Sequence, residues 1–421
     1  MTDIRRTLVL IAWAVPAITV AEPLELGASA GLTWSDNMRL ASQQEESDLL
    51  ETLDVTLAHR LAKSQVRWDT ALDLGFERYQ QDSYDDKITG EGSISALWRP
   101  DPRFDLTLSD RLSQERINRS DALTPDNRTQ QNVLSIEPGL NLYQNTPWPV
   151  RLSYAHVRTD YSKASQVDSV RNRVSARVSH ALSPVVTAGL AASHEVTDFD
   201  DDSQNTRNEA VFTWSRILPS GMVDLQLGGV TLEAETGSLT RDDSGVSASL
   251  SWTHRLPGRA RFNLFLEHTL DDSGSDRQAF AADGRLLNEN YSQSSKITRG
   301  IGTLTWQATG RDTTEVSAGY SRETELGQSQ NSTQLTLDIN QSHRINTLAS
   351  AGIRAAWQRD ASVTGFDTNL GTLAVWYQRT LSRQWSISSE IQHRKRTADL
   401  ASAEWDENRI MLTLNWKGLS R

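Results

Sequence analysis

Charged side chains recur at alternate positions in many segments of the chain, and they are the residues most able to do chemistry. In residues 66–77, for example, Arg67, Asp69, Asp73 and Glu77 share one set of alternating positions, and the other set is mostly apolar. A face of this kind can conduct or bind charged solutes, form internal ion pairs, or supply general acids and bases. The candidates for a charged face that lines water are Arg67, Asp69, Asp73, Glu77, Arg103, Asp105, Arg151, Arg171, Arg173, Arg177, Glu195, Arg261, Glu267, Arg354 and Glu390.

The motif content of the chain does not indicate catalysis on this face. No G-x-S-x-G, H-E-x-x-H or phosphate-binding glycine loop is present, and the chain has no cysteine. The acidic segment 198–202 offers carboxylates for calcium, but its spacing matches no known ligand loop, so a solvated loop is favoured. We expect no catalytic residue, no metal and no cofactor, and an enzyme that modifies lipids is the least favoured alternative.

Three arginines alternate on one segment. Arg171, Arg173 and Arg177 form a positive ladder, with Arg151 on the segment before it. One interpretation is a track for an anionic solute or a polysaccharide. The favoured alternative is ion pairing with nearby carboxylates such as Glu195.

The elements that must position these residues are long, amphipathic β-strands. Alternation over eight or more residues suits the ~9–11 residues that cross a bilayer at a tilt. Short corners separate pairs of strands at 59–64, 98–103, 144–147, 180–184, 216–221, 254–259, 308–311, 342–346 and 379–383. Polar loops, mostly longer, are expected near 35–47, 80–86, 118–128, 160–167, 198–205, 233–243, 271–293, 323–330, 358–367 and 396–403.

This arrangement predicts the fold class: all-β, a transmembrane antiparallel up-and-down β-barrel of about 20 strands, with 18 as the alternative. The corners become short periplasmic turns, and the polar loops become the longer extracellular loops. Because charged groups cannot face lipid cheaply, the polar face must line the interior. A barrel of this size has a lumen too wide for side chains to fill, which loop 271–293 could narrow.

Composition agrees with export to an outer membrane. Arg5 and Arg6, an apolar stretch to Val20 and the small residues before Glu22 predict a cleaved signal peptide at 1–21, followed by a barrel at 22–421. No later segment has the ~18 apolar residues of a transmembrane helix, and a mean hydropathy of −0.52 is normal for barrel strands. A net charge of −11 argues against a nucleic-acid partner.

Tryptophan placement predicts the two levels at which the barrel meets the membrane surfaces. Indole rings favour the headgroup region, where the ring is apolar and the N–H stays hydrated. Trp68, Trp98, Trp148, Trp214, Trp252, Trp306, Trp376, Trp385 and Trp416 lie near corners, and Trp34, Trp357 and Trp405 lie near the loops. These rings predict an aromatic girdle weighted to the periplasmic side.

Two segments carry a resemblance to a known family. The stretches L-T-W-S-D-N-M-R-L (residues 32–40) and E-E-S-D-L-L (residues 45–50) are similar to the start of outer-membrane β-barrel proteins associated with PEP-CTERM and exopolysaccharide gene clusters. The resemblance implies a role in export or surface assembly of an extracellular polysaccharide and transfers no catalytic residue. The final L-T-L-N-W resembles the signal by which the barrel-assembly machinery recognises its substrates, although the chain continues to Arg421.

The sequence therefore predicts a barrel in the outer membrane of a Gram-negative bacterium that is not an enzyme. The favoured function is a water-filled channel or surface component for polysaccharide export. A general diffusion porin and a structural or receptor barrel are the alternatives. The expected partners are outer-membrane lipid, the assembly machinery, and, for export, the polysaccharide and periplasmic export proteins.

Overall fold

The protein is described by a computed structural model that covers residues 24–117, 124–163, 166–237, 239–271, 279–280, 286–287, 295–325, 331–361 and 367–418. The predicted signal peptide and most of loop 271–293 lie outside these residues. The elements are β1 (Leu24–Ser35), β2 (Asp48–Ala62), β3 (Val66–Tyr79), β4 (Lys87–Asp101), β5 (Phe104–Arg116), η1 (Pro125–Asn127), β6 (Arg128–Leu142), β7 (Val150–Tyr161), β8 (Ser169–Ser183), β9 (Val186–Phe199), β10 (Ser203–Leu218), β11 (Gly221–Thr236), β12 (Leu239–Leu256), β13 (Ala260–Asp271), β14 (Ala279–Phe280), β15 (Leu286–Leu287), β16 (Ser295–Trp306), β17 (Asp312–Glu325), β18 (Asn331–Arg344), β19 (Ala349–Ala361), β20 (Asp367–Thr380), β21 (Trp385–Ala398), η2 (Ala401–Ala403) and β22 (Trp405–Lys417).

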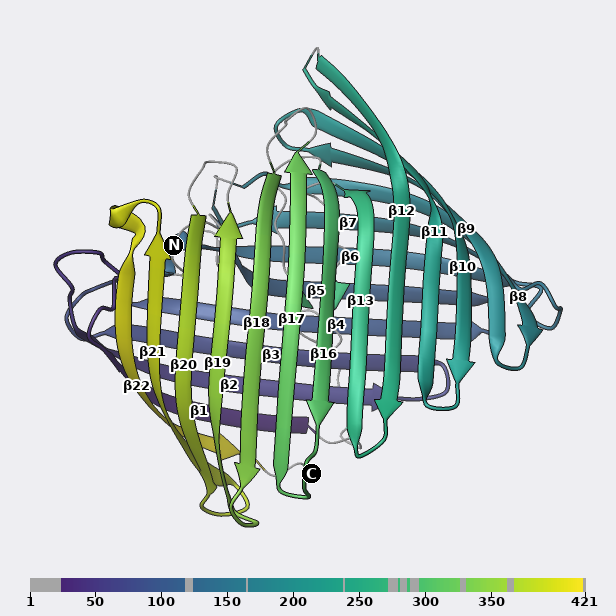
Figure 1. Cartoon of the computed structure of the whole chain (residues 1–421). Coiled ribbons are helices and arrows are strands. Elements are labelled where there is room, and N and C mark those ends of the chain that lie inside the picture. The colour runs from purple at the N-terminus through teal and green to yellow at the C-terminus, as the bar shows by residue number, and fades with distance from the viewer. Residues whose placement is uncertain are drawn as a thin grey trace.

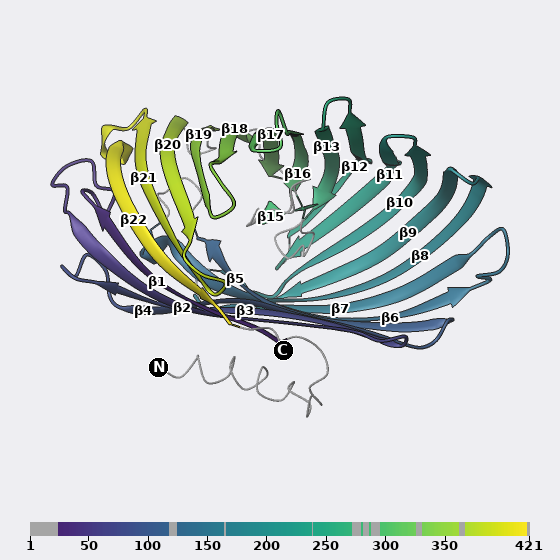
Figure 2. The same cartoon turned by 90° about the horizontal axis from the view of Figure 1, so that it is seen from below.

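Twenty of these strands form one closed antiparallel barrel, as predicted (Figures 1 and 2). Each strand pairs with its neighbours in the chain, β13 pairs with β16, and β1 pairs with β22 from Gly27↔Lys417 to Ser35↔Arg409. Closure leaves no free sheet edge, which a bilayer requires because lipid cannot hydrogen-bond to exposed backbone. The short strands β14 and β15 form a separate two-stranded sheet. No helix among the described residues is long and apolar enough to cross a membrane.

All nine predicted corners coincide with turns at one end of the barrel. Several are very short, such as the connection between β10 and β11, where Leu218 pairs with Gly221. Gly258, in the turn before β13, has φ +77°, a conformation that glycine adopts without steric cost. The turns are tight because strands crossing a bilayer need only a reversal on the periplasmic side.

The opposite end differs from prediction at two hairpins: β9 and β10 reach Phe199 and Ser203, which leaves only residues 200–202 of the expected loop 198–205, and the β11–β12 hairpin differs more strongly. Residues 233–243 were expected to form a loop, but β11 and β12 stay paired up to Thr236↔Leu239, and their hairpin projects beyond the rest of the wall at the top of Figure 1. Gly237, with φ +60°, allows the sharp reversal. The polar side chains that suggested a loop lie on a hairpin that continues past the rest of the wall.

The two faces of the wall separate as the alternation predicted. Large apolar side chains are exposed on the outward face, including Leu53, Val55 and Leu190, because they meet lipid rather than a protein core. Register places Trp68, Trp98, Trp214, Trp252, Trp306, Trp385 and Trp416 on this face towards the periplasmic end. Two tryptophans of the predicted girdle belong elsewhere. Trp376, which pairs with Glu390, and the buried Trp405 face inward.

Apolar packing inside the wall is local. Val230 and Leu232 on β11 pack with Leu270 on β13, and all three are buried. The contact forms because β12 pairs with β13 only from Ala248↔His268 downward, which frees the end of β13 to lie against the β11–β12 hairpin. This packing stabilises the outer rim at the point where the wall is split.

Candidate functional site

The candidate functional site is the inward face of the barrel. Cross-strand register and alternation from the exposed leucines place the predicted charged residues on this face, with Arg103 in the turn before β5. Several of them are brought together in ion pairs: Arg60–Asp69, Arg128–Glu77, Arg151–Asp105, Arg151–Glu137, Arg171–Glu195, Arg173–Glu195, Arg299–Glu267 and Arg354–Asp338. Within the described part of the chain, six of the predicted residues form no ion pair: Arg67, Asp73, Arg103, Arg177, Arg261 and Glu390.

The arginine ladder is partly neutralised by its neighbours. Arg171 Nε lies 3.6 Å from one Glu195 oxygen and Arg173 lies 3.7 Å from the other, and Arg171 is only 2% exposed. Arg171 also donates a 3.2 Å hydrogen bond from Nε to Thr197 Oγ1. This geometry favours wall pairing for these two arginines, whereas Arg177 lines a smaller cavity beside Arg151.

A second ionic cluster links β5, β6 and β7 near their periplasmic ends. Asp105 is 1% exposed and accepts bonds of 2.8 and 2.9 Å from the two terminal nitrogens of Arg151. Asn141 also donates to Asp105, and Glu137 lies 3.6 Å from Arg151. A two-pronged guanidinium–carboxylate contact is strong and directional, so it sets the spacing of β5, β6 and β7.

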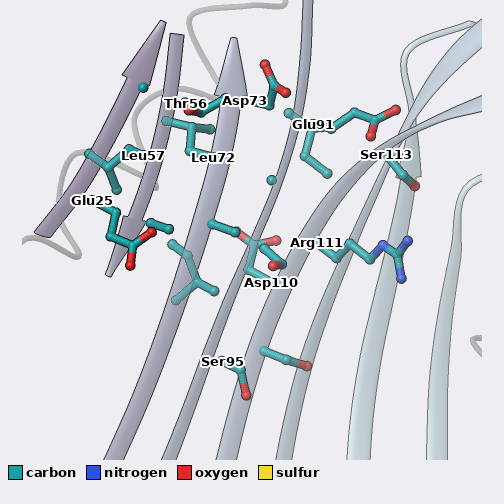
Figure 3. A pocket seen from close by; sticks show the side chains of 18 of the residues that line it. Glu25, Thr56, Leu57, Leu72, Asp73, Glu91, Ser95, Asp110, Arg111 and Ser113 are labelled. Carbon is teal, nitrogen blue, oxygen red and sulfur yellow. The ribbon is translucent and has the colours of Figure 1, made fainter. Parts of the chain in front are cut away.

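A cavity of about 1230 Å³ lies against the inward face of β1 to β6. Asp54, Asp73 and Glu91 line it on adjacent strands, and Arg111 lies further round the wall (Figure 3). Asp73 and Glu91 face each other directly across β3 and β4. No cation pairs with these three carboxylates within the described residues, so this part of the lumen carries net negative charge.

The first and last strands are joined by a buried ionic cluster that sequence reasoning missed. Glu407 on β22 is 0% exposed. It accepts bonds from Ser35 Oγ on β1 at 2.6 Å, from Arg394 Nε at 2.7 Å and from Arg409 Nε at 2.5 Å. The Arg394 guanidinium also lies 5.2 Å from the ring centroid of Trp405. We call Ser35, Arg394, Trp405, Glu407 and Arg409 the closure cluster.

The S-D-N motif of the family resemblance lies at the same joint. Asn37 is fully buried; its side-chain nitrogen donates to the carbonyls of Ala41 at 2.8 Å and Asp406 at 2.9 Å. Asp36 accepts bonds from the backbone and side-chain nitrogens of Asn408, both at 2.7 Å. The contacts of the motif in this structure are thus with its own loop and with the barrel's last strand.

The S-D motif downstream has a similar local role. The Asp48 carboxylate accepts backbone hydrogen bonds from Leu49 at 2.6 Å, Gln81 at 2.9 Å and Ser83 at 3.2 Å. These bonds hold the loop between β3 and β4 against the start of β2. No group of three or more metal-ligating side chains is assembled within the described residues.

Comparison with known proteins gives the fold. No protein-family model and no curated protein sequence matches the chain. Among solved structures, the FrpB iron transporter from Neisseria meningitidis in its apoprotein form matches with a TM-score of 0.52 and 7% identity, covering 95% of this chain and 82% of FrpB. The siderophore receptor PirA from Pseudomonas aeruginosa matches with a TM-score of 0.48 and 10% identity, covering 95% of this chain and 81% of PirA. The outer membrane protein opdK from that organism matches with a TM-score of 0.45 and 9% identity, covering 94% of this chain and 99% of opdK. The likeness to FrpB at this identity shows that the chain has the fold of an outer-membrane β-barrel.

Proposed function

We propose that the protein is a passive, water-filled channel in the outer membrane of a Gram-negative bacterium. The observation that carries the proposal is a closed barrel of 20 strands whose inward face bears charged side chains and a cavity of about 1230 Å³. Barrels of 16–18 strands already leave an aqueous channel, so a wall of this circumference encloses water unless something fills it. Charged groups on the inward face favour a hydrated lumen, because ionised side chains are stable there only in contact with water or with a partner of opposite charge.

No catalytic step forms part of this proposal. The ionised groups of the lumen are either paired with one another or spread along the wall, and no histidine lies among them. The function depends instead on the width of the lumen and on the sign of its charge.

Conductance across a planar bilayer tests the proposal. Reconstituted barrels are expected to give steady, ohmic current steps in potassium chloride, because a water-filled lumen conducts without a gating event. Heat-unfolded protein from the same preparation serves as the control for detergent leaks. Barrels that insert in folded form but carry no current contradict the channel and favour a structural or receptor role.

Polysaccharide export is the more specific form of the proposal. It is supported by the resemblance of residues 32–50 to barrels of exopolysaccharide gene clusters, although the motif residues contact the barrel itself. Under this proposal the polymer and periplasmic export proteins are partners.

A deletion strain tests polysaccharide export. Loss of the gene is expected to abolish surface polymer while leaving its intracellular synthesis intact. Normal surface polymer combined with altered uptake of small solutes would instead support a general diffusion porin. Complementation with the intact gene controls for effects on neighbouring genes.

A further inference from the structure

All eight histidines of the chain lie on the outward face of the barrel, in two belts. His59, His180, His254 and His343 are close to the periplasmic ends of β2, β8, β12 and β18. The other four, His156, His194, His268 and His393, lie towards the outer ends of β7, β9, β13 and β21. The sequence alone shows them as dispersed, because only strand register brings them to common levels.

Each histidine of the outer belt is hydrogen-bonded through Nδ1 to the residue directly opposite on the next strand. His156 contacts Asn172 Oδ1 at 2.9 Å, His194 contacts Asn208 Oδ1 at 2.7 Å, and His393 contacts Asn408 Oδ1 at 2.9 Å. His268 contacts Thr298 Oγ1 at 2.7 Å. An amide oxygen only accepts, so Nδ1 is the donor in the first three pairs.

One sector of this belt gathers cations. His268, Thr298 and Arg322 form a single row across β13, β16 and β17, since His268 pairs with Thr298 and Thr298 pairs with Arg322. Lys296 lies two residues beyond Thr298 on the same face of β16, and its Nζ is 3.9 Å from Asp243. Arg322 is exposed, and within the described residues it forms no ion pair with a carboxylate. We call His268, Lys296, Thr298 and Arg322 the outer basic patch.

Apolar residues lie directly below this patch. Leu266 and Tyr320, each two residues nearer the membrane centre on the same face, are exposed by 43% and 40%. The patch therefore marks a boundary between lipid chains and headgroups. The outward face of β5 to β9 differs, because it carries Asp110, Asp160 and Asp198 near the same boundary.

We propose that the outer basic patch binds a phosphate group on a glycolipid of the outer leaflet. Lys296 and Arg322 supply positive charge, Arg322 offers a planar fork of N–H donors, and Thr298 and His268 offer further polar contacts. Leu266 and Tyr320 contact the acyl chains of the same molecule. A free phosphate ion makes only the polar contacts, so the apolar floor favours a lipid as the occupant. The inference rests on the outer-membrane location proposed above and does not depend on conduction.

Lipid binding by the purified, folded barrel tests this site. The barrel in detergent micelles is titrated with bisphosphorylated lipid A and, separately, with lipid A from which the phosphates have been removed. Native mass spectrometry counts the bound lipid. We expect the triple variant H268Q/K296Q/R322Q to bind the phosphorylated lipid roughly tenfold more weakly, which is about 1.4 kcal/mol, and to bind the dephosphorylated lipid like the wild type.

The control is R158Q/H194Q, which removes one arginine and one histidine, one cation fewer than the triple variant, from the acidic sector of the same belt. It is expected to bind within twofold of the wild type. Inorganic phosphate at 10 mM is the competitor that distinguishes the two sources of the anion. Unchanged affinity of the triple variant, an equal loss in the control, or full displacement by inorganic phosphate would each overturn the proposal. If the triple variant does not fold, R322Q alone carries the test, with a roughly threefold loss expected.

Discussion

Replacing Glu407 with alanine is expected to lower the free energy of unfolding by about 3–5 kcal/mol, because it leaves two guanidinium groups at a buried site without the carboxylate that pairs with them. Glu407 is 0% exposed and accepts bonds from Arg394, Arg409 and Ser35. Arg394 and Arg409 then repel each other across β21 and β22. The effect should be visible as a lower urea concentration at the midpoint of unfolding. The folded fraction is measured on gels, where folded and unfolded barrels migrate differently.

Glu404 provides the control for this experiment. It lies in the loop before β22, is exposed, and makes one 3.4 Å contact with the Ala398 backbone nitrogen. E404Q should change the free energy of unfolding by no more than about 0.5 kcal/mol, as expected for a surface substitution. If Glu407→Ala unfolds like the wild type, the closure cluster does not hold the barrel shut.

Neutralising the unpaired carboxylates of the cavity is expected to change ion selectivity most strongly. Asp54, Asp73 and Glu91 give this part of the lumen net negative charge, which concentrates cations and excludes anions. The wild-type channel should therefore prefer potassium over chloride. In D54N/D73N/E91Q that preference should fall roughly tenfold, because field lines are focused where low-dielectric walls surround the charges. Reversal potentials in a potassium chloride gradient measure the change.

A matched control removes three carboxylates outside the lumen. D85N/D86N/D242N changes net charge by the same amount, with two positions in the loop after β3 and one on the outward face of the projecting hairpin. Selectivity in this variant should stay close to that of the wild type, and the remaining difference should vanish in 1 M salt, where the Debye length is ~3 Å. Equal effects of the two variants would show that bulk charge, and not the cavity, sets selectivity.

The fold could be predicted from the sequence because lipid acts on each residue separately. A strand whose every second residue meets lipid must alternate apolar and polar residues. The outward face of β12 can therefore be predicted from Val246, Ala248, Leu250 and Trp252 without knowing which strands lie beside it. Turns were located for the same reason, since each alternating stretch ends where the chain leaves the bilayer. The β11–β12 hairpin escaped prediction because beyond Leu232 most side chains on both of its faces are polar, so alternation carries little signal.

Most partners across strands could not be predicted in the same way, the pairing of Arg171 and Arg173 with Glu195 on the next strand being an exception. Arg207 is 1% exposed and was not a candidate, yet it donates from Nε to the Leu270 carbonyl at 2.9 Å, three strands away. That contact exists only because the end of β13 leaves β12. Glu407 and Ser35 are 372 positions apart, so nothing local in the sequence indicates that they meet. Predicting such pairs requires the register of every intervening strand.

The joint between β1 and β22 also bears on how the molecule assembles. The two strands that meet there are the first and last in the sequence, with all the other strands between them along the chain. Their pairing therefore closes the longest loop, costs the most chain entropy of any strand pairing and should come late in folding. Until then an intermediate exposes two unsatisfied backbone edges, each able to recruit another chain and start an aggregate. Burying charged contacts at this last-formed position makes reopening slow, so the finished barrel persists kinetically long after insertion.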